Sequence, residues 1–253
     1  MQGRVTKMPI DTKLGTKEIA ITVCFTALYA VLGFMPLSPI LGLPGKTITV
    51  AAIMALIIGV VLGPYLGALS TFLGGVIGYF ALSFSPMSFF SGIITALSIG
   101  LLFRGKRILC ALVYLLFLIL FGFYPVIGPA WLFPLSLWFQ IIGFIILISP
   151  LESWAVKSLN SNNNSRLLLA FFIISLASTL AGQIAGSLVF EIIVLGDAGW
   201  WTALWQSLTF LYPAERIIIA LSATFISAPL FRILEPANLK QLFTRANRRK
   251  MFP

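Results

Sequence analysis

Long apolar runs, separated by short polar or glycine- and proline-containing breaks, make up most of the chain. The runs cover residues 18–36, 48–64, 65–83, 88–103, 107–128, 132–154, 167–195 and 212–234. A helix needs about 20 apolar residues to cross the hydrocarbon core of a bilayer, with a range of roughly 17–25. The pattern therefore predicts an all-α integral membrane protein, a bundle of about eight transmembrane helices.

The breaks refine this prediction. Gly63 and Pro64 separate the second run from the third, because a glycine ends a helix readily and a proline fits its first turn. The run 88–103 is short, and both a full crossing and a re-entrant segment fit it. The run 167–195 is longer than a straight crossing requires, so we expect that helix to tilt or to protrude.

Composition agrees with a membrane protein and narrows its chemistry. Hydrophobic residues make up 59% of the chain and charged residues 9%, whereas a soluble domain carries roughly 25% charged residues. Histidine is absent, and Asp and Glu together number seven. Most acid–base and metal chemistry is thereby disfavoured, so we expect neither an enzyme nor a bound metal or cofactor.

The basic residues fall before the first run, in alternate breaks and after the last run. They are Arg4, Lys7, Lys13 and Lys17; Arg104, Lys106 and Arg107; Lys157 and Arg166; and Arg232, Lys240, Arg245, Arg248, Arg249 and Lys250. With eight crossings all of these lie on one face, and only Lys46 and Arg216 lie on the other. Cytoplasmic loops are rich in Lys and Arg, so the pattern predicts a plasma-membrane protein with both termini in the cytoplasm.

Three regions follow from this topology: a basic N-terminus (1–17), a transmembrane domain (18–235) and a basic tail (236–253). The tail contains "TRANRRK", which we interpret as a site for anionic lipid rather than for nucleic acid. The stretch "SLNSNNNSR" between the sixth and seventh runs has the composition of a flexible linker.

The stretch "GLPGKTITV" contains Gly45, Lys46 and Thr47, which match the end of a phosphate-binding P-loop. The first glycine of that motif would fall at position 40, which is Ile40, and the required strand and helix context is missing. Lys46 is therefore either a snorkelling interfacial residue or a ligand contact. The preceding loop, "MPLSPILGLPG", is predicted to fold over the outer mouth of the bundle.

Polar and aromatic residues converge with Lys46 on the outer side. Charged residues within or near membrane spans are costly and often functional. Structural explanations also exist: tryptophans form interfacial belts, and an acid complements a helix N-terminus. We predict a pocket for a small polar ligand here, since charges fix polar groups and rings cover flat ones. Its residues are Lys46, Glu191, Glu215 and Arg216, with Trp200, Trp201 or Trp205 as a stacking lid.

Small residues at a spacing of four allow helices to approach closely in lipid. In the runs 65–83 and 167–195 these stripes are expected to pack within the chain. In the first run, Thr22 and Thr26, with Val23 and Ala27 beside them, form a candidate docking face for a partner protein.

Three stretches resemble the substrate-binding S components of energy-coupling factor (ECF) transporters, especially the biotin-type vitamin transporters. They are "EIAITVCFTALYAVLGF", "KTITVAAIMALIIGVVLGPYLGALSTFLGGVIGYF" with its L-G-P-x-x-G-A turn, and "YPAERIIIALSATFISAPLFRIL" with its Pro-small-acid opening. Such subunits usually have six spans, so the resemblance implies a six-helix core with two added helices, for which the runs 107–128 and 132–154 are candidates.

The resemblance implies a subunit that captures a vitamin or similar small molecule from outside. It would deliver that molecule by docking on a coupling transmembrane subunit driven by two ATPases. In biotin-type members the acid of the last-helix motif contacts substrate, and here it is Glu215. The basic contact three positions later falls on Ile218. The docking motif A-x-x-x-A of the first helix falls on Val23 and Ala27.

Two other functions fit parts of the sequence. A structural or assembly subunit of a larger membrane complex would need no ligand. A membrane enzyme acting on lipid-linked substrates fits less well, because histidine and paired acids on the cytoplasmic face are missing.

Overall fold

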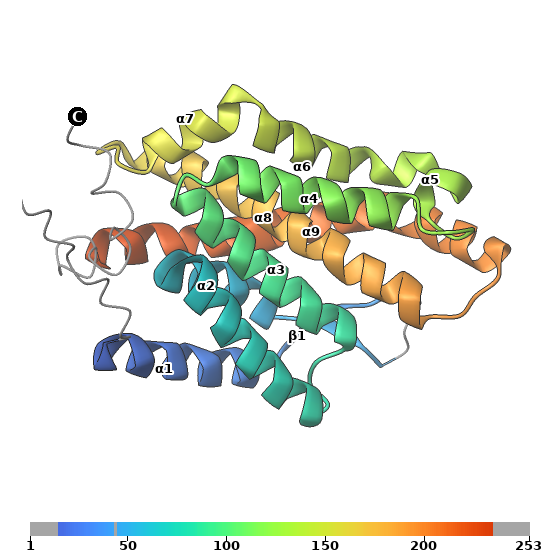
Figure 1. Cartoon of the computed structure of the whole chain (residues 1–253), viewed down its shortest axis with the longest axis horizontal. Coiled ribbons are helices and arrows are strands. Elements are labelled where there is room, and N and C mark those ends of the chain that lie inside the picture. Colours follow the sequence, from blue (N-terminus) through green and yellow to red (C-terminus); the bar gives the residue numbers. More distant parts are fainter. Residues whose placement is uncertain (1–14, 43–44, 235–253) are drawn as a thin grey trace, which may run out of the picture.

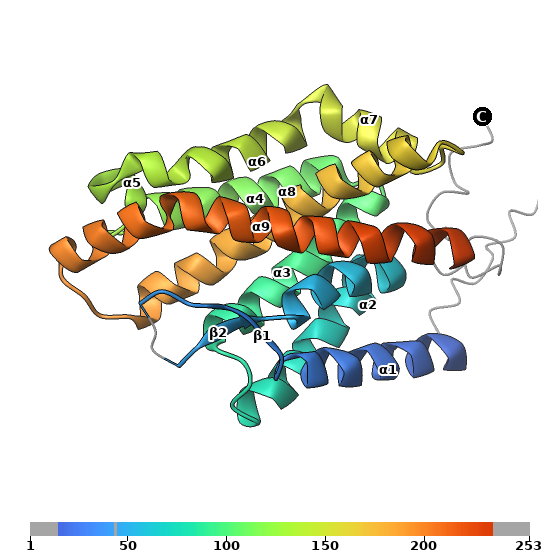
Figure 2. The same cartoon turned by 180° about the vertical axis from the view of Figure 1, so that it is seen from behind.

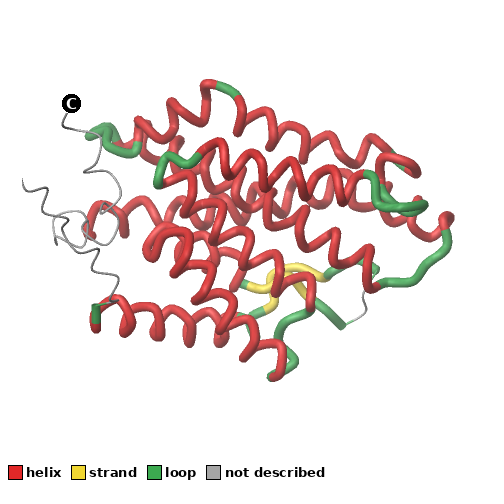
Figure 3. The backbone as a smooth tube through the Cα atoms, viewed as in Figure 1, coloured by secondary structure: helices red, strands yellow, loops and turns green. Residues whose placement is uncertain are grey.

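The computed structural model describes residues 15–42 and 45–234, which form a helical bundle with one small hairpin of strands (Figures 1 and 3). The elements are α1 (Thr16–Leu32), β1 (Pro36–Pro39), β2 (Thr47–Thr49), α2 (Ala51–Phe80), α3 (Pro86–Phe103), α4 (Arg107–Gly122), α5 (Pro129–Leu132), the 3₁₀ helix η1 (Pro134–Leu137), α6 (Trp138–Ile148), α7 (Pro150–Ser158), α8 (Asn164–Ile193) and α9 (Ala198–Leu234). The predicted basic tail lies outside the described residues.

Several of these helices are apolar enough and long enough to cross a bilayer. Within the described residues, α2, α3, α8 and α9 meet this requirement, and a bent pair running from η1 and α6 into α7 makes a fifth if it is taken as one span. The chain is therefore a mostly helical, multi-pass membrane protein, as its hydrophobic pattern predicts.

The predicted break between the second and third apolar runs is present within α2. Gly63 has φ 74° and ψ −174°, a backbone conformation that glycine adopts without steric cost. The chain folds back at this point, so that a Cβ on Gly67 would lie 3.1 Å from the Cα of Gly59. Glycines on both arms permit this close contact, and the two runs remain separate segments of the bundle.

The last helix begins earlier than predicted. We expected a span over 212–234, but α9 starts at Ala198 and continues through Pro213. A proline lacks the N–H that would bond the carbonyl four residues earlier, here that of Thr209. The indole Nε1 of Trp138 donates to this carbonyl oxygen at 3.0 Å. A side chain from the η1–α6 region thus replaces the missing backbone bond and lets the helix continue.

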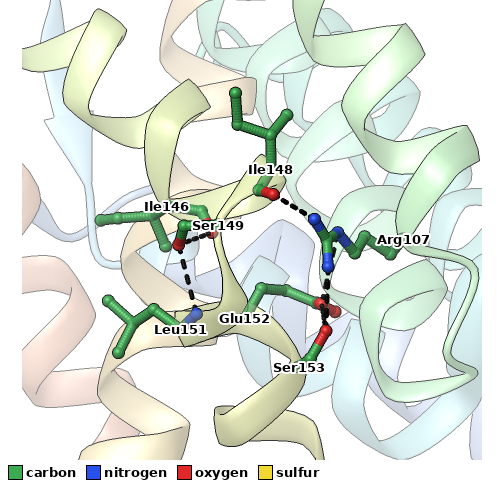
Figure 4. Close-up of polar contacts among 7 residues, drawn as sticks. All are labelled: Arg107, Ile146, Ile148, Ser149, Leu151, Glu152 and Ser153. Carbon is green, nitrogen blue, oxygen red and sulfur yellow. Dashed lines mark hydrogen bonds and ion pairs between the residues drawn. The ribbon is translucent and has the colours of Figure 1, made fainter.

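The predicted single run 132–154 is instead two helices, α6 and α7, which meet at an angle of 65°. Arg107 at the start of α4 holds this junction (Figure 4). Its guanidinium donates to the backbone oxygen of Ile148 and, at 2.9 Å, to Ser153 Oγ. Its Nε lies 3.7 Å from the buried carboxylate of Glu152. Pro150 starts the second helix, and these contacts satisfy polar groups that the bend exposes.

The expected packing of small-residue stripes inside the chain is confirmed for both long runs. A Cβ on Gly74 would lie 2.7 Å from the backbone oxygen of Thr26 in α1. A Cβ on Gly182 would lie 2.6 Å from the backbone oxygen of Ser91 in α3. The glycines of α2 and α8 therefore bring the backbones of neighbouring helices together.

The two ends of the bundle differ in charge. The start of α1, the α3–α4 and α7–α8 connections and the end of α9 lie at one end, whereas the β1–β2 hairpin and the α8–α9 connection lie at the other (Figures 1 and 2). We call these the basic end and the hairpin end. The basic end carries Lys17, Arg104, Lys106, Arg107, Lys157, Arg166 and Arg232.

The stretch predicted to be a flexible linker contains the end of α7, the connection to α8 and the first residues of α8. Asn163 caps α8, and its Oδ1 accepts from the backbone N–H groups of Ser165 at 2.9 Å and Arg166 at 3.3 Å. Asparagine is a favoured N-cap residue for this reason. One of the polar side chains on which the linker prediction rested, Asn163, therefore caps the next helix.

Candidate functional site

The loop between α1 and α2 folds into an antiparallel hairpin. Pro36 pairs with Thr49, Ser38 with Ile48 and Pro39 with Thr47, with an irregularity between Pro36 and Ser38. The prolines lack N–H donors, which confines them to edge positions and keeps the strands short. The hairpin lies against the bundle, in agreement with the predicted loop over its mouth.

A cavity of about 70 Å³ lies beneath this hairpin. One water molecule needs about 10–15 Å³ by the same measure, so the cavity holds a few waters or a small chemical group. The lining residues come from α1, the hairpin, α2, the start of α3, α8 and α9. They are Tyr29, Ile40, Ile48, Thr49, Ala52, Phe84, Met87, Ser88, Ser91, Gly92, Thr95, Thr179, Gln183, Gly186, Ser187, Phe190, Tyr212 and Arg216.

Hydroxyl side chains give the cavity much of its polarity. They were not among the site residues predicted from the sequence. Ser88, Ser91 and Thr95 lie on one side of α3 and line the cavity. On α8, buried polar residues recur at a spacing of four. They are Ser175, Thr179, Gln183, Ser187 and Glu191. A spacing of four within an apolar run places side chains on one helix face. This spacing is the sequence pattern from which the polar face of α8 could have been predicted.

Gln183 is central to the cavity wall. Neither its amide oxygen nor its amide nitrogen has a hydrogen-bond partner among the described residues. Buried polar groups are nearly always paired with protein or water. The amide therefore has one acceptor and two donors that no described residue uses.

Glu215 and Arg216 are both buried, yet they face different surroundings. Glu215 Oε1 accepts a hydrogen bond from Ser38 Oγ in β1, across 177 residues of sequence. Arg216 lines the cavity, and its Nη2 lies 3.8 Å from Glu215 Oε2. The acid thus fastens the hairpin to α9, and Arg216 forms part of the cavity wall.

Glu191 lies at the end of the polar face of α8 and is 2% exposed. In the described ranges, neither of its carboxylate oxygens has a hydrogen-bond partner, and it forms no ion pair. It is not one of the residues that line the cavity. Its predicted role in ligand binding is therefore not supported by direct contact, although it lies one turn beyond Ser187, which does line the cavity.

The predicted stacking lid of tryptophans does not cover the cavity. Trp201 and Trp205 are 0% and 2% exposed and stack on each other with ring centroids 5.3 Å apart. Trp205 Nε1 donates to the backbone oxygen of Ile127 at 2.9 Å. Trp200 is more exposed and stacks on Phe190, a residue of the cavity wall. The hairpin, rather than the tryptophans, covers the cavity, because α9 starts early enough to bury their rings.

Lys46 lies in the hairpin, directly before β2. Its backbone oxygen accepts from the N–H of Ile40 at 2.9 Å, so the residue helps to close the hairpin. Its side chain is half-buried and does not line the cavity.

The predicted docking stripe on α1 divides between two faces. Thr22 and Thr26 are buried against α2, and Thr26 Oγ1 lies 3.1 Å from Ser70 Oγ. Val23 and Ala27 point away from the bundle and are exposed. Thr22 Oγ1 donates to the backbone oxygen of Glu18 within α1 at 2.7 Å. Both threonines are buried inside the chain, which corrects their assignment to an exposed docking face.

In the described part of the chain, no three His, Cys, Asp or Glu side chains come together in a way that would hold a metal ion. Comparisons with protein-family models, with curated proteins and with solved structures find no match to this chain.

Proposed function

We propose that this chain is the substrate-capturing membrane subunit of an ECF-type importer for a vitamin or similar small molecule. The observation that carries the proposal is the cavity beneath the β1–β2 hairpin, whose wall includes hydroxyl, amide and guanidinium side chains in an otherwise apolar bundle. Apolar side chains with a few convergent polar groups are typical of small-molecule sites. The hairpin fastened by Ser38 and Glu215 would keep the captured molecule from returning to the outside.

The proposed topology is eight crossings of the plasma membrane with both termini in the cytoplasm. The gathering of Lys and Arg at the basic end supports it, because such residues concentrate on the cytoplasmic side. The break at Gly63 also supports it, because the chain reverses direction there and the two arms of α2 are separate segments. The hairpin end would face outward, where the ligand is met. The basic tail, 236–253, would bind anionic lipid.

Ligand capture is tested by native mass spectrometry of the purified protein, which reports a bound small molecule as a mass increase. Ala52 lines the cavity and Ala20 is exposed on α1. Ala52→Phe should remove the bound molecule because the ring fills the cavity, whereas Ala20→Phe should leave it in place. If wild type carries no molecule after exposure to a small-molecule extract of its cells, the chain is an assembly subunit instead.

The proposed partners are a coupling transmembrane subunit and its two ATPases, which would dock on the exposed side of α1. Val23 and Ala27 lie on that side. Ala27→Trp should abolish uptake in cells and leave ligand binding by the purified subunit intact. Ala214→Trp, on an exposed position of α9, is the matched control and should preserve uptake. Loss of binding in Ala27→Trp would show that this side of α1 supports the fold instead.

A further inference from the structure

The guanidinium of Arg216 is buried without adequate partners. The residue is 5% exposed, and its Nε has no hydrogen-bond partner among the described residues. Its contact with Glu215 Oε2, at 3.8 Å, is an ion pair that is too long for a hydrogen bond. A guanidinium stays charged and carries five N–H donors. Buried donors of this kind need acceptors, and the cavity that Arg216 lines is a place where acceptors can bind.

Glu215 cannot fill that need in the observed arrangement. Its Oε1 accepts from Ser38 Oγ in the hairpin, and its Oε2 accepts no hydrogen bond from the described residues. Glu215 does not line the cavity. The acid therefore balances part of the charge of Arg216 without lining the cavity. It accepts no hydrogen bond from the guanidinium of Arg216.

Arg216 is also the one charged side chain among the described lining residues. The other polar groups of the wall are hydroxyls, the unpaired amide of Gln183 and backbone. The apolar part of the wall includes Phe84, Met87 and Phe190. The cavity wall thus combines one guanidinium, one amide that can both donate and accept hydrogen bonds, and apolar side chains.

We propose that the cavity binds a small organic monoanion through its carboxylate, with Arg216 as the principal contact and Gln183 as a second polar contact. This inference rests on the proposed capture function and names the class of molecule captured. Arginine matches a carboxylate because two parallel N–H groups meet its two oxygens. A doubly charged phosphate fits less well, because a single cation at membrane depth leaves the second negative charge unpaired.

The test uses native mass spectrometry on the protein as purified and with a fixed panel of acids and their primary amides. The pairs are acetate and acetamide, propionate and propionamide, and butyrate and butyramide, whose sizes suit a cavity of about 70 Å³. Each amide keeps the size of its acid and removes the charge. We expect either a copurifying molecule with one acidic group or binding of a panel acid at least tenfold tighter than its amide.

Two variants locate the contact. Arg216→Gln should weaken binding of the acid at least tenfold, and Arg216→Lys should have a smaller effect because it keeps the charge and loses the fork. The acid–amide comparison in wild type does not depend on either variant folding. A bound molecule without an acidic group, an amide that binds as well as its acid, or unchanged binding in Arg216→Gln overturns the anion assignment and leaves ligand capture standing. If nothing copurifies and no panel member binds, both proposals fail.

Discussion

Neighbouring residues in the chain serve different parts of the site. Glu215 turns to the hairpin and Arg216 to the cavity, because successive residues of a helix are about 100° apart around its axis. The sequence placed both in a ligand site, and the resemblance assigned a substrate contact to Glu215 alone. The distinction matters for mutagenesis, since removal of the acid alters the hairpin first and the ligand contact second.

Glu191 and Glu215 should respond in opposite ways to the same substitution. Glu191 is buried with both oxygens unpaired in the described structure, and a buried unpaired charge is unfavourable. Glu191→Gln removes that charge and should leave the thermal stability of the purified protein unchanged or raise it. Glu215→Gln weakens the contacts to Ser38 and Arg216 and should cost about 1–3 kcal/mol.

The comparison is made from melting curves of the two variants in the same detergent. A loss of stability in Glu191→Gln as large as that in Glu215→Gln would show that Glu191 has a charged partner in solution.

At the scale of the elements, α9 depends on a contact from outside itself. The Thr209 carbonyl that Pro213 leaves without a backbone donor receives the indole N–H of Trp138. A buried carbonyl without a donor costs about 1–3 kcal/mol. The helix therefore passes through its proline because the η1–α6 region packs beside it.

Trp138→Phe should destabilise the protein by about 1–3 kcal/mol, because the ring is kept but the donor is lost. Adding Pro213→Ala should recover much of this loss, since alanine restores the backbone N–H to Thr209. Chemical unfolding in detergent measures both effects. Trp154→Phe, at a more exposed position of α7, is the control. If Trp138→Phe destabilises the Pro213→Ala variant as much as it destabilises the wild type, the indole does not compensate for the proline.

The turn within α2 depends on a second glycine, in α3. A Cβ on Gly100 would meet the backbone of Pro64 and lie 2.6 Å from the carbonyl carbon of Gly63. Backbone atoms cannot rotate away as a side chain can, so Gly100→Ala should cost about 1–3 kcal/mol or more. Gly122→Ala is the matched control, because its Cβ would meet only Leu137, at 3.5 Å. The same unfolding assay should find Gly122→Ala close to wild type, and equal losses in both variants would contradict the proposed close contact.

Across the whole molecule, basic residues and the hairpin mark opposite ends of the bundle (Figure 2). Ser161 lies in the α7–α8 connection at the basic end, and Ala198 starts α9 at the hairpin end. In a chain with Cys24 and Cys110 replaced by alanine, single cysteines at these two positions should react with an impermeant thiol reagent from opposite sides of the membrane. Labelling of both from the same side would exclude the proposed topology.

Local signals predicted the helical bundle well. The runs of apolar residues and the Gly63–Pro64 pair determine where helices form and break, because backbone preference and hydrophobicity act over a few residues. The contacts of the site could not be predicted in the same way. Ser38 and Glu215 are 177 residues apart, and nothing near either residue indicates the other.

The tryptophans illustrate a second limit of prediction from sequence, which concerns where an apolar side chain lies. An apolar ring suits the lipid, the interface and the protein interior alike, because hydrophobicity does not separate lipid-facing from buried positions in a membrane protein. Trp201 and Trp205 are therefore core residues that composition placed at the interface. Their true place depends on the early start of α9, which the proline at position 213 concealed.

The hydrogen bond between Trp138 and Thr209 predicts which residues should change together among homologous chains. The α4–α7 segment includes the runs that the resemblance treats as additions to a six-helix core, and it also contacts α9 through Ile127 and Trp205. In this chain the segment supplies the indole that donates to the Thr209 carbonyl, which Pro213 leaves without a backbone donor. Homologous chains that contain this segment should therefore gain or lose Trp138 and Pro213 together.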